Sequence, residues 1–543
     1  MTPGGQDAIP RMWADAAVCA RKVYDFAVYM EKALAFDPAN RSKDCTLMDA
    51  DILIIGSGMG GATLAAALAP SGRRIVIVER GERLADSPEA RDPAAIFGRG
   101  HFRPNEIWYD AEGRPFNPGN YSFVGGNSKF YGAVLLRYRA EDFRPLRHID
   151  GMTPGWPIAY DDLEPFYSSA EVLYRVRGDA AGDPTEPRHS APYPFPPVPD
   201  EPDIATLRQA FAAQGLHPSA LPLGVDLERW LARAPTTWDA FPDTTGAKSD
   251  AESCGLAVAL AYPNVTLLTG TRVNRLIALG RRVTGVEVEG PDEVRTTLQA
   301  PVVCLCAGAV MSAALLLRSA NDDYPMGLAN GSDQVGRNFM NHNLTAMIAF
   351  NPRRRNRSVY EKTIQFNDWY LTGGPMGEPL GNIQMLGRVT GPILAGESGL
   401  PVWLSGYLAD RSIHIMAMSE DLPDPQSRVM WKNGGVVLDW RRTNVKAHDL
   451  LVGRLRRAMR RAGWPLVLSK GFPKSKPSHQ CGTALMGNDP ATSVVDRNLR
   501  AHDLDNLYIA DASVLPTSAA VNPSLTVAAL ALRLGQHLNA IAP

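Results

Sequence analysis

The hydrophobic pattern of the chain predicts short buried strands that are each followed by a helix. The stretch "ADILIIGSGMGGATLAAALA" (50–69) has the pattern of an apolar strand, a glycine turn and a helix of small residues. The apolar run "RRIVIVERG" (73–81) predicts the next strand, and a strand, a turn and a helix follow over 302–318. The tail, 479–543, repeats this order. Strands that alternate with helices are typical of an α/β fold.

Between these segments lie two loop-rich regions and a second type of pattern. Residues 85–120 are polar and rich in glycine and proline and predict a long loop. Residues 177–240 are rich in proline and predict a loop, a linker or a lid over a site. Residues 345–470 contain alternating stretches such as "RSIHIMAMSE" and "GGVVLDWRR", which predict strands of a second lobe. We therefore predict an α/β fold in which a Rossmann-like domain, assembled from discontinuous segments, carries a substrate domain with a largely antiparallel sheet.

The domain prediction follows from these patterns. Apolar residues recur at helical spacing over 11–36, which predicts an N-terminal helical extension at 1–48. We expect this extension to pack on the body or to bind a partner. The Rossmann-like domain comprises 49–144, 264–344 and 471–543. The substrate-binding domain comprises 145–263 and 345–470.

Composition and charge narrow the class of protein. The chain has 543 residues and a net charge of −1, so electrostatics give no reason to expect a nucleic-acid partner. No run of about 18 apolar residues occurs, so no membrane span is expected. The first residues lack a basic segment followed by an apolar one, and the six cysteines contain no CxxC pair. These features predict a cytoplasmic enzyme.

The glycine turn indicates a dinucleotide site. Gly56, Gly58 and Gly61 form G-x-G-x-x-G between the strand and the helix, which allows a sharp turn, close approach of a pyrophosphate and close helix packing. Glu79, at the end of the next strand, has the spacing of an acid that binds ribose hydroxyls. The motif does not say which dinucleotide binds. Rossmann-like pieces at the start, middle and end of the chain favour FAD over NAD.

The tail extends this pattern into a resemblance that spans nearly the whole chain. "SHQCGTALMG" contains H-x-x-G-T-x-x-M-G from His479, and "NLYIADASVLP" and "NPSLTVAALA" follow it. "VGGNSKFYGAVLLR" (124–137) and "VGRNFMNH" (335–342) lie upstream. With the glycine turn, these stretches resemble the glucose–methanol–choline (GMC) oxidoreductases, which are FAD-dependent alcohol oxidases and dehydrogenases.

The resemblance implies a role for each matching residue. His479 and Asn522 match the two catalytic positions beside the flavin and the substrate hydroxyl. Phe130 stands where some members attach FAD through histidine, so FAD is expected to bind non-covalently; Tyr131 departs from the asparagine common at its position, so no contact is transferred to it. The expected cofactor-binding residues are Gly56, Gly58, Met59, Gly60, Gly61, Glu79, Arg80, Gly126, Asn127, Ser128, Val273, Ala307, Gly308, Asp511, Ala512, Asn522, Pro523 and Ser524. No metal site is predicted.

The chemistry of alcohol oxidation supports the same two catalytic residues. An alkoxide donates a hydride far better than an alcohol does, so a neutral imidazole near the hydroxyl is a suitable general base. Asn522 precedes a proline at the start of a helix, so its side chain either caps the helix or holds the substrate. Structural roles are expected for several other residues. Cys481 is expected to pack in the interior, "RRRNR" (353–357) to form a solvated loop, and Trp369, Trp403 and Trp440 to lie in the core. His342 either lines the pocket or supports the lobe, and His414 is a further candidate for the site.

The predicted function is FAD-dependent oxidation of an alcohol, on a sugar, a glycoside or an aromatic compound, to a carbonyl. A hydride passes to the flavin, and the electrons pass on to oxygen or another acceptor. A flavoprotein lyase on the same scaffold, a simple NAD-dependent dehydrogenase and a subunit without turnover are the alternatives.

Overall fold

A five-stranded parallel sheet forms the centre of the first lobe. The computed structural model describes residues 50–541, so the predicted extension 1–48 lies outside the described residues. The strand order is β20-β12-β1-β2-β8, and all neighbours are parallel. The strands are β1 (Ile52–Ile55), β2 (Ile75–Val78), β8 (Val265–Leu268), β12 (Val302–Leu305) and β20 (Leu507–Ile509). The order changes direction between β1 and β12, and such a switch point is where α/β sheets bind ligands.

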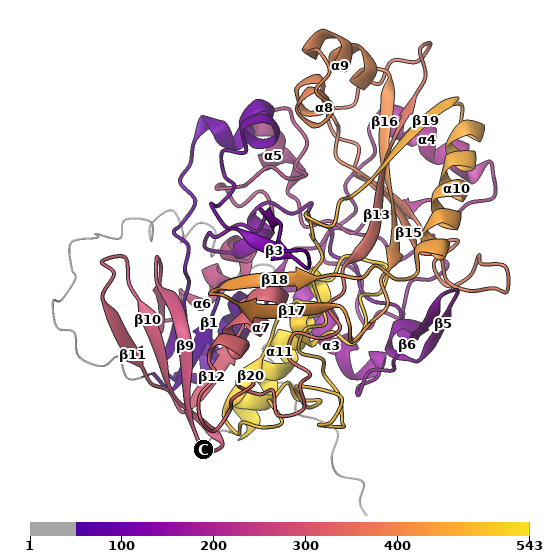
Figure 1. Ribbon diagram of the computed structural model, residues 1–543. Helices are drawn as coiled ribbons and strands as arrows, with labels where there is room; N and C mark the ends of the chain where they lie inside the picture. The colour runs from indigo at the N-terminus through magenta and orange to yellow at the C-terminus, as the bar shows by residue number, and fades with distance from the viewer. Residues whose placement is uncertain (1–49, 542–543) are drawn as a thin grey trace, which may run out of the picture.

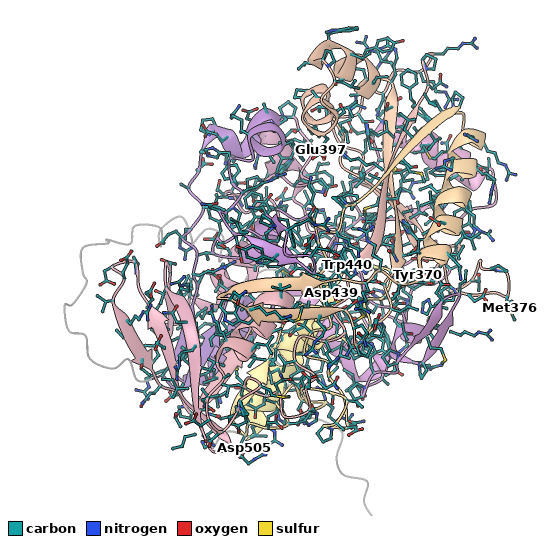
Figure 2. All side chains as sticks on the ribbon, viewed as in Figure 1. Tyr370, Met376, Glu397, Asp439, Trp440 and Asp505 are labelled. Carbon is teal, nitrogen blue, oxygen red and sulfur yellow. The ribbon has the colours of Figure 1, made fainter. Side chains whose placement is uncertain are left out.

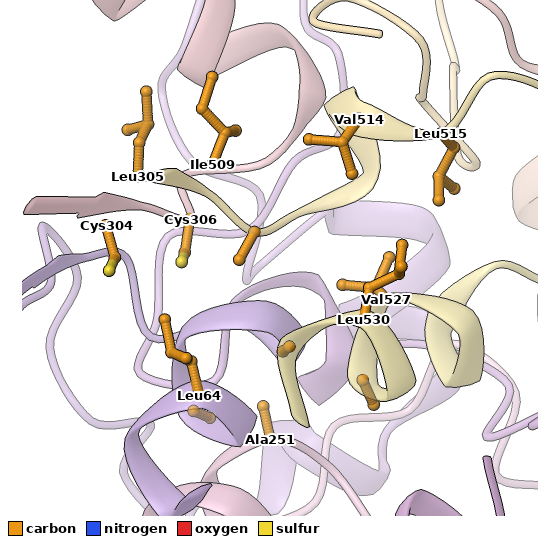
Figure 3. Close-up of a cluster of buried hydrophobic side chains, with 14 of the residues drawn as sticks. Leu64, Ala251, Cys304, Leu305, Cys306, Ile509, Val514, Leu515, Val527 and Leu530 are labelled. Atoms are coloured by element: carbon orange, nitrogen blue, oxygen red, sulfur yellow. The ribbon is translucent and has the colours of Figure 1, made fainter. Parts of the chain in front are cut away.

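Helices cover this sheet and complete its core. They are α2 (Met59–Leu68), α7 (Ala309–Arg318) and α11 (Ser524–Ile541). Figure 3 shows Leu64 of α2, Leu530 of α11 and the strand residues Cys304, Leu305 and Ile509 in one apolar cluster. The helices α2 and α11 pack closely: a Cβ placed on Gly535 of α11 would lie 2.5 Å from the Cβ of Ala67 on α2. Each fully buried leucine contributes about 1.5–3 kcal/mol to folding.

An antiparallel sheet and a mixed sheet flank the parallel sheet (Figure 1). One has the order β11-β10-β9, and the other has the order β17-β18-β3-β4 with a parallel β18–β3 pair. Their strands are β3 (Trp108–Asp110), β4 (Pro115–Phe116), β9 (Arg272–Leu279), β10 (Arg282–Glu289), β11 (Arg295–Leu298), β17 (Arg428–Lys432) and β18 (Gly435–Asp439).

The second lobe contains a six-stranded antiparallel sheet with the order β19-β13-β16-β15-β14-β7. Its long helix α10 (Val445–Arg461) buries Leu451, Leu455 and Met459 in a separate hydrophobic core, which α4 (Pro202–Ala212) also joins. The strands are β7 (Ser219–Ala220), β13 (His342–Phe350), β14 (Ile364–Phe366), β15 (Asn382–Met385), β16 (Ser412–Glu420) and β19 (Leu466–Gly471). The predicted fold class is confirmed.

Two smaller groups of elements complete the described chain. The helix α3 (Tyr160–Leu173) packs against α11, and its Glu164 and Glu171 form buried ion pairs with Arg137. The Tyr370 hydroxyl, near the junction of the lobes in Figure 2, donates to Asp142 and accepts from the Ala520 N–H. The remaining strands and α-helices are the hairpin β5 (Leu146–His148) and β6 (Gly151–Thr153), and the helices α5 (Leu227–Arg233), α6 (Ala257–Ala259), α8 (Gly391–Ser398) and α9 (Val402–Ala409).

The prediction of three core tryptophans is wrong for one of them. Trp440 is 3% exposed and Trp369 is partly buried, but Trp403 is 75% exposed. Trp403 lies on α9, whose apolar residues occur on all sides, and α8 and α9 project from the second lobe (Figure 1). A projecting helix can bury only one face, so an apolar residue on the other face remains in solvent. The "RRRNR" loop is exposed apart from Asn356, as expected.

Candidate active site

The carboxyl ends of the parallel strands bring remote predicted residues to one edge. Gly56 follows β1, Glu79 follows β2, Ala307 and Gly308 follow β12, and Asp511 follows β20. Parallel strands end at the same edge of a sheet, so these four turns are neighbours although the residues span more than 450 positions. The glycine turn, the middle segment and the tail therefore meet at the predicted place.

The glycine turn leaves an open cradle at the start of α2. Gly56 has φ +101°, and a Cβ there would lie 2.4 Å from the carbonyl oxygen of Cys306. A Cβ on Gly58, in contrast, would have no neighbour within 4 Å. Gly126 stands opposite, since a Cβ placed on it would lie 3.5 Å from the Cα of Gly58. The first N–H groups of a helix have no partner inside the helix, so this space has the donors and the positive potential that a phosphate needs.

Two buried carboxylates hold the turns around this cradle. Glu79 accepts hydrogen bonds from the Ser57 N–H at 2.9 Å, the Ser57 hydroxyl at 2.6 Å and the Gly81 N–H at 2.9 Å. Asp511 accepts from the Gly308 N–H and the Ser312 hydroxyl, at 2.9 and 2.5 Å. Burial raises the pKa of Asp511, and these hydrogen bonds oppose the shift. Both carboxylates thus tie a turn to a neighbouring strand end, in addition to any contact with a ligand.

Other predicted cofactor residues have side chains that are engaged within the protein. Arg80 pairs with Glu106 at 2.9 Å. Asn127 is exposed, and its oxygen accepts from the Tyr121 N–H. The Ser128 hydroxyl donates to the Gly125 carbonyl and accepts from the Ala251 N–H. These three side chains stabilise the loops in which they lie.

The remaining predicted contacts rest on backbone atoms. The Val273 carbonyl on β9 accepts from the guanidinium of Arg318, whose pKa burial lowers to about 10. The Ala512 carbonyl accepts from the Gly482 N–H at 3.2 Å, which joins the Asp511 turn to the segment that carries His479. Met59 is half-buried, and Gly60 is buried against the tail, since its Cβ would lie 1.8 Å from the Ala510 carbonyl oxygen.

Three consecutive residues before and at the start of β13 hold His479. Met340 and Cys481 exchange two backbone hydrogen bonds, each of 2.9 Å. The side chain of Asn341 accepts from the His479 N–H at 2.6 Å. His342 contacts the His479 ring itself, with 2.7 Å between their Nδ1 atoms. The stretch 335–342, which the resemblance had singled out, is thus the support of the candidate base.

His479 and Asn522 lie side by side, as the resemblance implies. The Asn522 Nδ2 is 3.4 Å from the His479 Nε2, and both residues are half-buried. The Asn522 Oδ1 accepts from the side chain of Gln384 at 3.1 Å. The helix α11 begins at Ser524, two residues later, so Asn522 directs its side chain to His479 and Gln384 while the chain turns into the helix.

A row of buried amides continues from Gln384 across the second lobe. The Gln384 Nε2 also donates to Asn382, and Asn382 donates to Gln365 and Asn367. Asn367 in turn donates to the Asp183 carboxylate at 2.6 Å. Sequence analysis missed these residues; the only signal was a polar residue at every second position of "GNIQ", on a strand that is buried on both sides.

The environment keeps His479 neutral. Its pKa is lowered well below the usual value, first by burial and then by His342 and the ammonium of Lys362. Lys362 pairs with Asp239 at 2.7 Å. Burial also lowers the pKa of His342, and its hydrogen bond to the Ser518 carbonyl opposes the shift. A neutral imidazole can accept a proton, which is the state required of a general base.

Two other residues considered from the sequence do not join this pair. Cys481 is buried, and burial raises the pKa of its thiol well above the usual value, so it packs as the sequence indicated rather than acting as a nucleophile. His414 is fully buried on β16, where its Nδ1 lies 3.0 Å from Glu361. His342, for which the sequence left two roles open, contacts the candidate base.

Comparison with known proteins agrees with this geometry. The family described as GMC oxidoreductase matches residues 196–344 and 471–531, and an NAD(P)-binding Rossmann-like domain matches 54–101. The chain is 32% identical to the 6'''-hydroxyparomomycin C oxidase of Streptomyces lividus, over 90% of this chain and 91% of that protein. It is 30% identical to the paromamine 6'-oxidase of Streptomyces fradiae, over 89% and 90%.

A solved structure has the same fold. Pyridoxine 4-oxidase from Mesorbium loti superposes with a TM-score of 0.64 at 23% identity, over 91% of this chain and 100% of that one. The chain belongs to the GMC oxidoreductases, and it is an FAD-dependent enzyme that oxidises alcohols. The open cradle at Gly58 and the helix start beside it fit the pyrophosphate of FAD. Within residues 50–541, no helix is both long and apolar enough to cross a bilayer.

Proposed function

We propose that His479 is the general base of alcohol oxidation and that Asn522 holds the same hydroxyl. The 3.4 Å contact between the His479 Nε2 and the Asn522 Nδ2 carries this proposal. An alcohol is both a donor and an acceptor of hydrogen bonds. Its O–H donates to the His479 Nε2, and its oxygen accepts from the Asn522 Nδ2. FAD, when bound, supplies the acceptor for the hydride that leaves the substrate carbon.

The rate effect of the base follows from proton transfer. General-base assistance is worth about 10²–10⁴-fold, or roughly 3–5 kcal/mol of barrier. His479 takes the alcohol proton as the carbon loses its hydride, so the alkoxide never has to form free in solution. Asn522 fixes the oxygen, which keeps the reacting carbon in one orientation.

The cofactor residues are proposed as follows. The N–H groups at the start of α2 and the open space beside Gly58 would hold the pyrophosphate, and Glu79 would bind the ribose. The start of α11, from Asn522 to Ser524, lies at the positive end of an 18-residue helix, which stabilises nearby negative charge by about 0.3–1 kcal/mol. FAD is held non-covalently, because Phe130 provides no atom for a bond to the ring.

The domain and location predictions remain proposals. The cofactor domain comprises 49–144, 264–344 and 471–543, and the substrate domain comprises 145–263 and 345–470. Cytoplasmic location likewise remains a prediction from the sequence.

For the substrate, we propose a hydroxyl of a sugar or glycoside and oxygen as the electron acceptor. Two relatives that match nine-tenths of the chain are named as oxidases, one of them acting on paromamine. The buried amides of Gln384 and Asn382, which continue from Asn522, make the second lobe polar next to the candidate pair. A polar neighbourhood suits a substrate with several hydroxyl groups better than a long apolar alcohol.

Anaerobic mixing with a panel of alcohols tests this proposal. The panel contains paromamine, glucose, a benzyl alcohol and a long-chain alcohol, and the loss of flavin absorbance reports substrate oxidation. We expect the sugar-like alcohols to bleach the flavin fastest and admission of oxygen to restore the colour. His479→Ala should retain the colour but reduce at least 100-fold more slowly, in line with loss of a general base. An unchanged rate in this variant would remove His479 as the base.

A further inference from the structure

The ring of His342 has one donor and one acceptor, and its partners decide which nitrogen is which. Its Nε2 lies 3.0 Å from the carbonyl oxygen of Ser518. A carbonyl only accepts hydrogen bonds, so this Nε2 carries the hydrogen. A neutral imidazole has a single N–H, so the Nδ1 of His342 is an acceptor.

The same reasoning passes to His479. The two Nδ1 atoms are 2.7 Å apart, so one hydrogen lies between them. Because His342 Nδ1 is the acceptor, His479 donates from its own Nδ1. The His479 Nε2 therefore keeps a free lone pair on the side of Asn522. Burial favours the neutral form of both rings, which this assignment requires.

A second series of hydrogen bonds, through Gln384 and Asn522, independently indicates that the His479 Nε2 is an acceptor. The Gln384 Nε2 donates to the Asn522 Oδ1 at 3.1 Å, so the amide group of Asn522 turns its Nδ2 toward His479. An Nδ2 that faces a ring nitrogen needs an acceptor there. The His479 Nε2 can fill that role only in the tautomer that His342 imposes.

We propose that His342 is a positioning residue that fixes His479 as the Nδ1–H tautomer and so makes its Nε2 the base. This inference rests on the proposed role of His479. In the step itself the alcohol O–H bond breaks and an Nε2–H bond forms on His479. The resulting imidazolium keeps its Nδ1–H bond to His342, which stabilises the positive charge. The opposite tautomer would present an N–H to the alcohol and could not take its proton.

Two substitutions of His342 separate positioning from structural support. His342→Leu removes the acceptor, whereas His342→Asn can present its Oδ1 near the original Nδ1 position. We expect His342→Leu to slow anaerobic flavin reduction about 100-fold or more, because a wrong histidine tautomer costs up to about 10⁴-fold in serine proteases. His342→Asn should recover at least tenfold of that loss. The substrate concentration that gives half-maximal rate should change little in either variant.

His448→Leu is the matched control. His448 is also a buried histidine beside β13, and it bonds Thr345 and Ser419 without contacting His479. It should lose stability but keep the rate of reduction and its pH profile. If His448→Leu and His342→Leu slow reduction equally, His342 acts as structural support and the inference fails.

The tautomer can be observed without turnover. In holoenzyme labelled with ¹⁵N-histidine, the signals that disappear in His479→Ala identify this residue among the ten histidines. We expect a protonated Nδ1 and an unprotonated Nε2 in the wild-type enzyme, a shift toward protonated Nε2 in His342→Leu, and retention of the wild-type tautomer in His342→Asn. A protonated Nε2 in the wild-type enzyme would overturn the inference. A normal rate in His479→Ala would instead overturn the proposed base.

Discussion

Gly58 gives a sharp test of the cofactor cradle, because an alanine there should impair binding and leave the fold intact. The backbone of Gly58 has φ −69° and ψ −168°, which any residue can adopt. A Cβ at this position would have no protein atom within 4 Å. The added methyl group would instead lie in the space proposed for the pyrophosphate.

The expected magnitude follows from crowding. Forcing an extra methyl group into a packed contact typically costs 1–3 kcal/mol, which weakens FAD binding by about 5- to 150-fold. Replacing a glycine whose backbone tolerates alanine stabilises the chain by about 0.4–1 kcal/mol through the unfolded state. Gly58→Ala should therefore raise the dissociation constant for FAD without lowering the stability of the FAD-free protein.

Gly61→Ala is the control within the same motif. A Cβ on Gly61 would lie 2.0 Å from the carbonyl oxygen of Gly56, so alanine there clashes with the backbone and destabilises the fold itself. The assay titrates FAD into protein stripped of its flavin, and measures thermal melting with and without FAD. Binding of FAD stabilises the folded protein by RT ln(1 + c/Kd), where c is the concentration of free FAD, so weaker binding gives a smaller rise in melting temperature at the same FAD concentration. Without FAD, Gly58→Ala should have the melting temperature of the wild type. When FAD is added, its melting temperature should rise less than that of the wild type.

The opposite pattern would refute the reasoning. If Gly58→Ala binds FAD with wild-type affinity, the space beside Gly58 does not hold the pyrophosphate. If it melts much lower than the wild type without FAD, the space is needed by the protein itself. Either result would move the proposed cradle away from the start of α2.

Two further predictions concern groups near the candidate pair. Burial and the charge of Glu420 raise the pKa of Asp142 to about 7. A carboxyl whose pKa is raised on folding stabilises the fold most at low pH, and this contribution is lost as the pH rises from about 4 to 7. The free energy of unfolding of Asp142→Asn, relative to that of the wild type, should therefore increase by about 2–3 kcal/mol between pH 5 and pH 8. Urea unfolding measures this difference, and equal pH profiles of the two proteins would contradict the prediction. Gln384→Met leaves the Asn522 Oδ1 without its donor, so flavin reduction should slow about 5- to 150-fold, equivalent to 1–3 kcal/mol, while a wild-type rate in stopped-flow measurements would exclude a role for Gln384.

The sequence predicted those features that depend on local pattern. The strand, glycine turn and helix at 52–68 follow from an apolar run, a glycine that adopts φ +101° and a run of small residues. His479 was found because its neighbours form a recognisable motif. The Rossmann-like lobe was likewise evident, since its strands are short, continuous and apolar.

The features that were missed depend on packing between distant segments. His342 and His479 are 137 positions apart, and Gln384 and Asn522 are 138 apart. No local periodicity indicates which polar residue of a buried strand faces a candidate catalytic side chain. The exposure of Trp403 has a similar cause, because the composition of α9 does not indicate that the helix projects from the lobe.

We infer that the six-stranded sheet sets the polarity of the proposed catalytic pair. His479 and Asn522 belong to the tail, whereas His342 lies at the start of β13 and Gln384 on β15 of the six-stranded sheet. One partner makes His479 an acceptor, and the other makes Asn522 a donor. An alcohol needs both, since it donates one hydrogen bond and accepts another. The two strands are held in register by β16, which pairs with each of them. A shift of that register by one residue would turn His342 and Gln384 to the opposite face of the sheet. The contacts of His342 with His479 and of Gln384 with Asn522 would then both be lost. The six-stranded sheet therefore sets which atom of the proposed pair donates and which accepts a hydrogen bond.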